Sequence, residues 1–214
     1  MKKLRPLLIA WAAGLALWLL LGCVSLAKTA WYAGQGLAAT QSLTAEDFTP
    51  VGIQPYDAGE EGLWYISTDG DPQLLWQGEA YLDTVWLFVE HESPPQAVML
   101  YWKTPGQTDF SPRQSVYGVQ TAPGVYSFDL GGVKVSEVRI DPDSQGGVVT
   151  RLDGVVFDPD LSPLAAFLPG AGEGMLLLFV PPLALAVFCQ LRRALGALLK
   201  KDDRSNEKRG HNNE

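Results

Sequence analysis

The chain has 214 residues, a formal net charge of −8 and 47% hydrophobic residues. This length allows one ordinary domain with accessory segments, and the acidic balance disfavours partners that are polyanions. The charge is unevenly distributed, because the segment Lys28–Glu173 holds 20 acidic and 6 basic residues while both ends of the chain are basic. We therefore expect no nucleic-acid partner and an acidic middle region that differs in character from the two termini.

Two uncharged apolar runs separate these regions, Leu7–Ala27 and Gly174–Leu191. About 20 apolar residues span the hydrocarbon of a bilayer, so both runs are candidate transmembrane helices with the lipid bilayer as their partner. Lys and Arg flank them at their outer ends, in residues 1–6 and in 192–214, and such residues remain cytoplasmic. The sequence predicts a two-span protein of the cell membrane with both termini cytoplasmic, an extracytoplasmic middle domain and a disordered polar tail.

The first run has two other interpretations. Its basic start also fits a signal peptide, with Ser25–Ala27 as a small-residue cleavage site. The stretch Leu20–Cys23 resembles a lipobox, whose cysteine would be lipidated. Within the run, Ala10 and Gly14 form a small-xxx-small pair, which permits close helix contact but also fits ordinary lipid-facing composition.

Cys23 and Cys189 are the two cysteines of the chain, and each lies in one of the apolar runs. The middle region therefore has no disulfide available and needs a hydrophobic core of its own.

The middle region reads as a spacer over 28–43, a β domain over 44–160 and an interfacial apolar segment over 161–173. Short runs with β-strand composition alternate with turn-forming Gly, Pro and Asp, and no helical period occurs among them. This pattern predicts a mainly β protein, an antiparallel β-sandwich of eight or nine strands. The expected strands are Phe48–Ile53, Leu63–Ser67, Gln73–Gln77, Thr84–Glu90, Gln96–Lys103, Ser115–Gln120, Val125–Leu130, Val133–Ile140 and Val148–Phe157.

Two predicted turns separate the last three of these strands. Gly131-Gly132 is typical of a two-residue β-hairpin, because both glycines can adopt positive φ. Asp141 to Gly147 combines Pro, Asp, Ser and Gly in a second turn.

Several short motifs in Thr44–Pro159 resemble one pattern. They are Asp71-Pro72-Gln73 at a strand entrance, an apolar strand ending near His91, Phe110-Ser111 in a loop, and Arg139-Ile140-Asp141-Pro142 before the last strand. Together they are similar to jelly-roll domains of the galactose-binding-like, carbohydrate-binding-module type. The resemblance implies a bacterial, membrane-anchored, non-catalytic module with Asp71, Pro72, Arg139, Asp141 and Pro142 as its structural motif.

Two strands break the alternation expected of a half-buried sheet. Val85, Leu87 and Val89 fill one face of the first strand, and Trp86 and Phe88 fill the other. On the second strand, Val98, Leu100 and Trp102 likewise oppose Ala97, Met99 and Tyr101. If the aliphatic residues face the core, an outward sheet carries Trp86, Phe88, Met99 and Tyr101. Either another segment covers these residues, or they form a platform that binds a sugar or a protein.

Reactive groups are sparse in the middle region. It contains one histidine, His91, which we interpret as a structural strand-end residue, and many scattered carboxylates. Asp141, Asp143 and Ser144 resemble part of a calcium loop, which the jelly-roll resemblance favours, but the terminal glutamate of an EF-hand is missing and turn capping explains these residues better. Arg139 is expected to pair with a nearby acid such as Asp141 or Asp153. We predict no enzyme activity and no cofactor beyond a possible structural calcium.

The sequence thus supports three hypotheses. The first is a membrane-held module that binds carbohydrate or a lipid-linked glycan in cell-envelope polysaccharide assembly. The second is an interaction subunit that docks on a larger membrane enzyme or transporter. The third is an extracytoplasmic hydrolase, which would need a pair of carboxylates of different pKa.

Overall fold

The computed structural model describes residues 5–58, 63–159, 167–169 and 171–210, the side chains of 171 and 195–210 excepted. It divides into two compact units. One comprises Met1–Val24 with Ala166–Glu214, and the other comprises Ser25–Ala165. Most of the predicted interfacial segment 161–173 lies outside the described residues.

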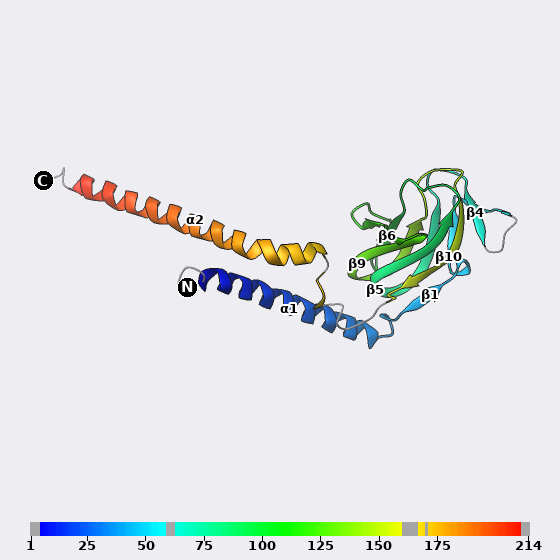
Figure 1. The fold of residues 1–214 in the computed structure, drawn as a ribbon, viewed down its shortest axis with the longest axis horizontal. Helices are drawn as coiled ribbons and strands as arrows, with labels where there is room; N and C mark the ends of the chain where they lie inside the picture. Colours follow the sequence, from blue (N-terminus) through cyan, green and yellow to red (C-terminus); the bar gives the residue numbers. More distant parts are fainter. Residues whose placement is uncertain (1–4, 59–62, 160–166, 170, 211–214) are drawn as a thin grey trace. The chain divides into compact units, whose positions relative to one another are not determined.

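Two long helices are apolar enough to cross a membrane by length and composition. They are α1, Arg5–Ala33, and α2, Ala171–Gly210, and their apolar stretches contain the two predicted spans (Figure 1). Both helices are longer than expected. Helix α1 extends into the predicted spacer, and α2 continues through the tail to Gly210, so the expectation of a disordered tail was wrong there. The reason is local, because Ala197–Arg209 contains neither Gly nor Pro and is rich in helix-forming residues.

The second unit is an antiparallel β-sandwich, as the sequence predicted. Ten strands are connected by hydrogen bonds in the order β3-β4-β10-β5-β9-β6-β7, with β1, β2 and β8 attached to β10, β5 and β9. The strands are β1 Gln41–Leu43, β2 Thr49–Val51, β3 Ile53–Pro55, β4 Trp64–Ser67, β5 Gln73–His91, β6 Met99–Lys103, β7 Ser115–Tyr117, β8 Val119–Ala122, β9 Val125–Asp141 and β10 Val149–Phe157.

Strands β5 and β9 are much longer than predicted and pair with each other along their length. The register of this pair shifts between Leu82 and Thr84, where the core-facing positions of β5 change from even to odd numbers. Leu74, Trp76, Ala80 and Leu82 face the core before the shift, and Val85, Leu87 and Val89 face it afterwards. The two halves of each long strand therefore belong to different parts of the sandwich. In both β5 and β9, two strands that were predicted as separate form one continuous strand.

The predicted hairpin at Gly131-Gly132 was wrong. Both glycines do adopt positive φ, of 68° and 75°, but they lie inside β9 opposite the register shift of β5. They form a bulge at which the strand bends and continues, instead of a turn that reverses it. The second predicted turn is confirmed, since the chain between Asp141 and Val149 forms the connection from β9 to β10.

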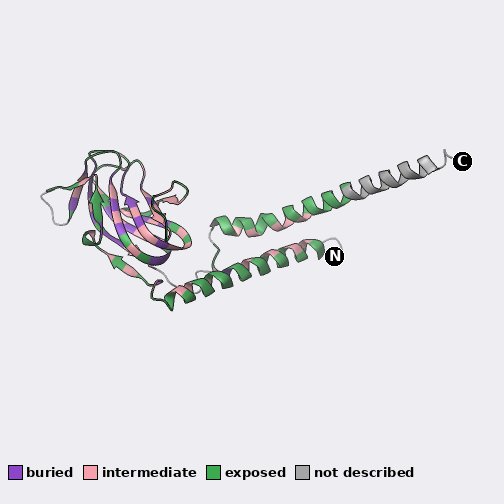
Figure 2. Ribbon diagram, turned by 180° about the vertical axis from the view of Figure 1, so that it is seen from behind, coloured by how far each residue is buried: buried purple, intermediate pink, exposed green. Residues whose placement is uncertain are grey.

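One hydrophobic core fills the sandwich (Figure 2). Its most buried large side chains include Leu87, Leu100, Phe128 and Phe157, each with no exposed surface. Val85, Leu87 and Val89 face this core as predicted, so Trp86 and Phe88 point to the opposite face of β5.

Candidate functional site

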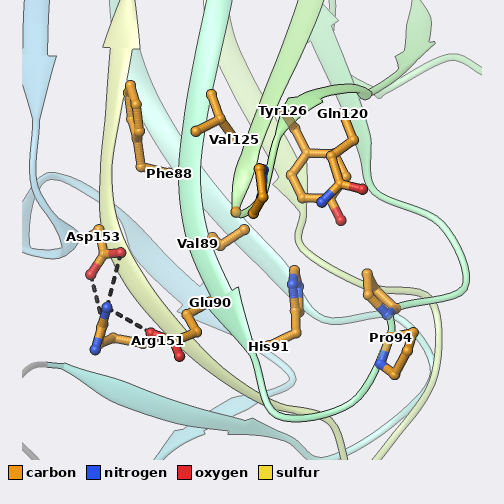
Figure 3. Close-up of a pocket in the computed structure, with 13 residues that line it drawn as sticks. Phe88, Val89, Glu90, His91, Pro94, Gln120, Val125, Tyr126, Arg151 and Asp153 are labelled. Atoms are coloured by element: carbon orange, nitrogen blue, oxygen red, sulfur yellow. Dashed lines mark hydrogen bonds and ion pairs between the residues drawn. The ribbon is translucent and has the colours of Figure 1, made fainter.

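A groove of about 670 Å³ lies at one end of the sandwich and is open to solvent. Three separate segments form its walls: the end of β5 with the loop that follows it, the connection from β8 to β9, and β10. Figure 3 shows the labelled side chains of these segments around the groove. The lining residues that carry polar or aromatic groups are Phe88, Glu90, His91, Gln120, Tyr126, Arg151 and Asp153.

A bulge in β10 places two polar residues in this groove. Leu152 pairs with Val89 and Gly154 pairs with Phe88, so Asp153 is the additional residue between them. Gly154 has φ 153°, which a glycine accepts more readily than other residues. Arg151 and Asp153 both point outward as a consequence, next to the half-buried ring of Phe88.

Arg151 organises the charged wall of the groove. Its Nε donates to Asp153 Oδ1 at 2.7 Å, and its Nη2 forms an ion pair with Glu90 Oε2 at 2.7 Å. The guanidinium also lies over the ring of Trp64, 5.5 Å from the ring centroid. These groups are partly exposed, so they add little to stability. They do hold several hydrogen-bond acceptors and donors in fixed positions beside an aromatic ring.

His91 and Tyr126 form the opposite side of the groove, with their rings 6.2 Å apart and nearly perpendicular. His91 Nε2 lies 2.9 Å from the carbonyl oxygen of Pro142, and because a carbonyl can only accept, Nε2 carries the proton. Burial lowers the pKa of His91, which keeps the ring neutral at pH 7 and leaves Nδ1 as an acceptor.

The four residues of the predicted platform do not form one surface. Strand β9 lies between β5 and β6 in the sheet. On β6, Met99 and Tyr101 pair with Asp141 and Arg139 of β9. Trp86 and Phe88 lie on the other half of β5, opposite Ser127 and Val125. The prediction that all four residues share one outward face is therefore corrected. Of the four, only Phe88 lines the groove, and its ring centroid lies 6.2 Å from that of Trp86.

The predicted structural motif does come together. Arg139 donates from Nε to Asp141 Oδ1 and from Nη2 to Asp141 Oδ2, both at 2.7 Å, and Nη2 also bonds to Asp71. The guanidinium lies 4.9 Å from the ring centroid of Tyr101, and Pro72 and Pro142 are buried nearby in the chain. Burial raises the pKa of the Asp141 carboxyl, and Arg139 opposes this effect. Arg139 thus pairs with Asp141, one of its two predicted partners.

Two of the calcium candidates are engaged in other hydrogen bonds. Asp141 is engaged by Arg139, Asp143 Oδ1 accepts from the backbone nitrogen of Gln145 at 2.8 Å, and Ser144 is exposed. Within the described part of the chain, no group of three acidic, His or Cys residues could hold a metal ion. The geometry of these residues is that of turn capping.

Reasoning from sequence did not find Glu90, Tyr126, Arg151 or Asp153 as site residues. A signal for two of them was present, because a glycine inside a strand marks a bulge and Gly154 directly follows Asp153. Nothing in the sequence showed that the segment Pro94–Pro95 and the turn at Pro123-Gly124 would enclose the same space.

No protein-family model and no curated protein matches this chain. Its fold is similar to solved structures of carbohydrate-binding modules. A xylan-binding module, CBM86, of Roseburia intestinalis is 16% identical with a TM-score of 0.39, covering 56% of this chain and 94% of the module. A family 6 module of Clostridium cellulolyticum in complex with xylose is 14% identical with a TM-score of 0.37, covering 55% and 95%. A family 32 module of C. perfringens NanJ in complex with galactose is 8% identical with a TM-score of 0.40, covering 56% and 99%. Similarity at this level carries no argument about a ligand.

Proposed function

We propose that the β domain is a non-catalytic module that binds carbohydrate in the groove beside Phe88. The observation that supports it is the combination of an open groove of about 670 Å³ with an aromatic ring and a fixed polar network. This volume is in the range of about 300–1,000 Å³ that small-molecule sites occupy. A sugar ring has one apolar face and a rim of hydroxyls, and Phe88 with Glu90, Arg151 and Asp153 complements both.

Hydrolysis fits this groove less well. A glycosidase needs a carboxyl of raised pKa beside a second carboxylate. The carboxyls whose pKa is raised, with burial as the main cause, are Asp83, Asp141, Asp143 and Asp158, and these are not among the residues that line the groove. The two acids that do line it, Glu90 and Asp153, both neutralise Arg151.

The module is held at a membrane in this proposal. Helices α1 and α2 contain stretches with the length and composition to span a bilayer, and Arg5 and Arg192 lie at the outer ends of these two stretches. Positive residues remain in the cytoplasm, which places the groove outside the cell. In this proposal the module acts in the assembly of cell-envelope polysaccharide. Alkaline phosphatase fused after Ser42 should be active and the same fusion after Lys201 inactive; activity after Lys201 would overturn the topology.

The binding test uses the full chain in detergent on an array of neutral and acidic oligosaccharides. Phe88→Ala and Arg151→Gln should weaken binding of the best ligand about tenfold or more, equivalent to about 1.4 kcal/mol. Trp86→Ala is the matched control, because Trp86 is the neighbouring outward aromatic of β5 and lies outside the groove lining. Equal loss in Trp86→Ala and Phe88→Ala would contradict the assignment of the site to the groove.

A docking role is the alternative, and one observation favours it. Tyr117 and Val119, two residues apart on β7 and β8, are 65% and 66% exposed, and exposed apolar side chains that lie together can mark a docking surface. No glycan binding on the array, together with co-purification of a membrane protein that Tyr117→Ser abolishes, would replace the glycan proposal with this one.

A further inference from the structure

Helix α2 contains two consecutive prolines, Pro181 and Pro182. Proline has no backbone N–H, so each one leaves the carbonyl four residues earlier without its helical donor. The two carbonyls are those of Leu177 and Leu178. In the hydrocarbon of a membrane an unsatisfied carbonyl is costly, and neighbouring helices are one means of satisfying it.

Helix α1 supplies a donor to one of these carbonyls. The indole Nε1 of Trp11 donates a hydrogen bond of 3.1 Å to the carbonyl oxygen of Leu178. This is the carbonyl that Pro182 leaves free. The contact joins residues 167 positions apart in the sequence, within one compact unit of the chain.

A second contact lies next to the first. A Cβ atom added at Gly14 would come within 2.9 Å of Cγ of Pro181, so the proline ring occupies the space that the glycine leaves open. Gly14 follows Trp11 by three residues and therefore lies on the same side of α1. The donor and the small residue that face the two prolines are thus one turn apart on one helix.

The exposure pattern supports a specific pairing of the two apolar helices. Residues with reduced exposure recur every three or four positions on both helices within this unit, whereas most of the residues between them are exposed. They are Leu7, Ala10, Gly14, Trp18 and Gly22 on α1, and Gly174, Leu177, Pro181, Pro182 and Leu185 on α2. Such a period defines one face of each helix.

We propose that α1 and α2 form a specific intramembrane pair in which Trp11 and Gly14 recognise the Pro181-Pro182 break of α2. This rests on the proposed membrane placement and is independent of glycan binding. The indole of Trp11 replaces the donor that Pro182 lacks, and Gly14 admits the ring of Pro181. The first span therefore acts as an interaction surface for the second and does more than anchor the domain.

The native cysteines provide the test. Cys23 and Cys189 are exposed and lie one on each helix, so both accept spin labels without any substitution. Pulsed electron paramagnetic resonance on the full chain in lipid vesicles should give one narrow distance distribution. Trp11→Phe should raise the ratio of separated to paired helices about threefold to tenfold, the size expected for an interhelical hydrogen bond in a membrane. Gly14→Leu should broaden the distribution as well.

Two further variants make the test specific. Trp31→Phe is the matched control, because Trp31 lies on the same helix, is 70% exposed and is outside the paired face, so this change should leave the distribution narrow. Pro182→Ala returns an intrahelical donor to the Leu178 carbonyl, so Trp11→Phe should have no additional effect in that background. A broad distribution for the wild type, or equal distributions for Trp11→Phe, Trp31→Phe and the wild type, would overturn the pairing. Resistance to alkaline extraction verifies insertion, and release of the wild-type chain would overturn the membrane placement and the pairing while leaving the glycan proposal standing.

Discussion

Leu87 and Trp86 are adjacent on β5 and face opposite sides of it, so they offer a direct test of which side is the core. Leu87 has no exposed surface, and Trp86 is half-buried. Leu87→Ala removes a fully buried side chain and should lower the free energy of unfolding by about 2–5 kcal/mol. For a domain of this size that corresponds to a fall in Tm of roughly 10–20 °C.

Trp86→Ala should cost much less. Part of the Trp86 surface remains in contact with water, unlike that of Leu87, and its ring packs against Phe88, so we expect a loss of about 1 kcal/mol and a few degrees in Tm. Calorimetry of the full chain in mild detergent measures both variants through the transition of the β domain. If Trp86→Ala lowers Tm as much as Leu87→Ala, Trp86 is covered in the native protein and the outward assignment of this face is refuted.

Three other predictions concern the same domain. Burial lowers the pKa of His91 from 6.5, so the unfolded chain binds the proton more readily than the folded chain does. The contribution of the neutral His91 to the free energy of unfolding is therefore complete above pH 6.5, and it is lost as the pH falls toward the lower pKa of the folded state. Melting curves from pH 8 to 5 should show a shallower decline in His91→Gln, and parallel curves would exclude this role for His91. Gly131 and Gly132 both have positive φ, but a Cβ at Gly132 meets the hydroxyl of Tyr81, whereas nothing lies within 4 Å at Gly131. Gly131→Ala should therefore cost only the backbone strain of about 1–2 kcal/mol, and Gly132→Ala should cost distinctly more; equal costs would contradict the bulge geometry. Because Asp141 and Asp143 are engaged by Arg139 and the Gln145 amide, a calcium chelator should leave Tm unchanged, and a fall of several degrees would restore the calcium interpretation.

Local pattern predicted much of this fold. The alternation of Val85, Leu87 and Val89 identified the core side of β5, and the predicted Val148–Phe157 differs from β10 by one residue. The continuity of β9 could not be predicted in this way. A glycine with positive φ suits both a hairpin and a bulge, and the difference depends on whether a partner strand continues alongside. At Gly131-Gly132 that partner is β5, which is more than 40 residues earlier in the chain.

The site was harder to predict than the fold, because a site depends on which strands are neighbours. The proposed platform joined Trp86 with Tyr101 on the assumption that two apolar strands close in sequence share a face. The insertion of β9 between them is a non-local event that no local alternation shows. His91 was interpreted as a structural residue, and its bond to the Pro142 carbonyl agrees with that.

The breaks in alternation nevertheless have a common physical meaning. In a regular strand, core-facing residues are two positions apart, yet Leu152 and Val155 on β10 are both buried and three apart, as are Leu82 and Val85 on β5. One extra residue is therefore accommodated at Asp153-Gly154, and the break at Asp83-Thr84 coincides with the shift in the β5–β9 register, where the extra residues belong to β9. At the first break it bends β10 beside the groove and turns Asp153 outward next to Arg151. At the second break, β5 passes from one part of the sandwich to the other. The same irregularity in the apolar pattern thus determines both the crossing of the long strand and the polar wall of the proposed binding groove.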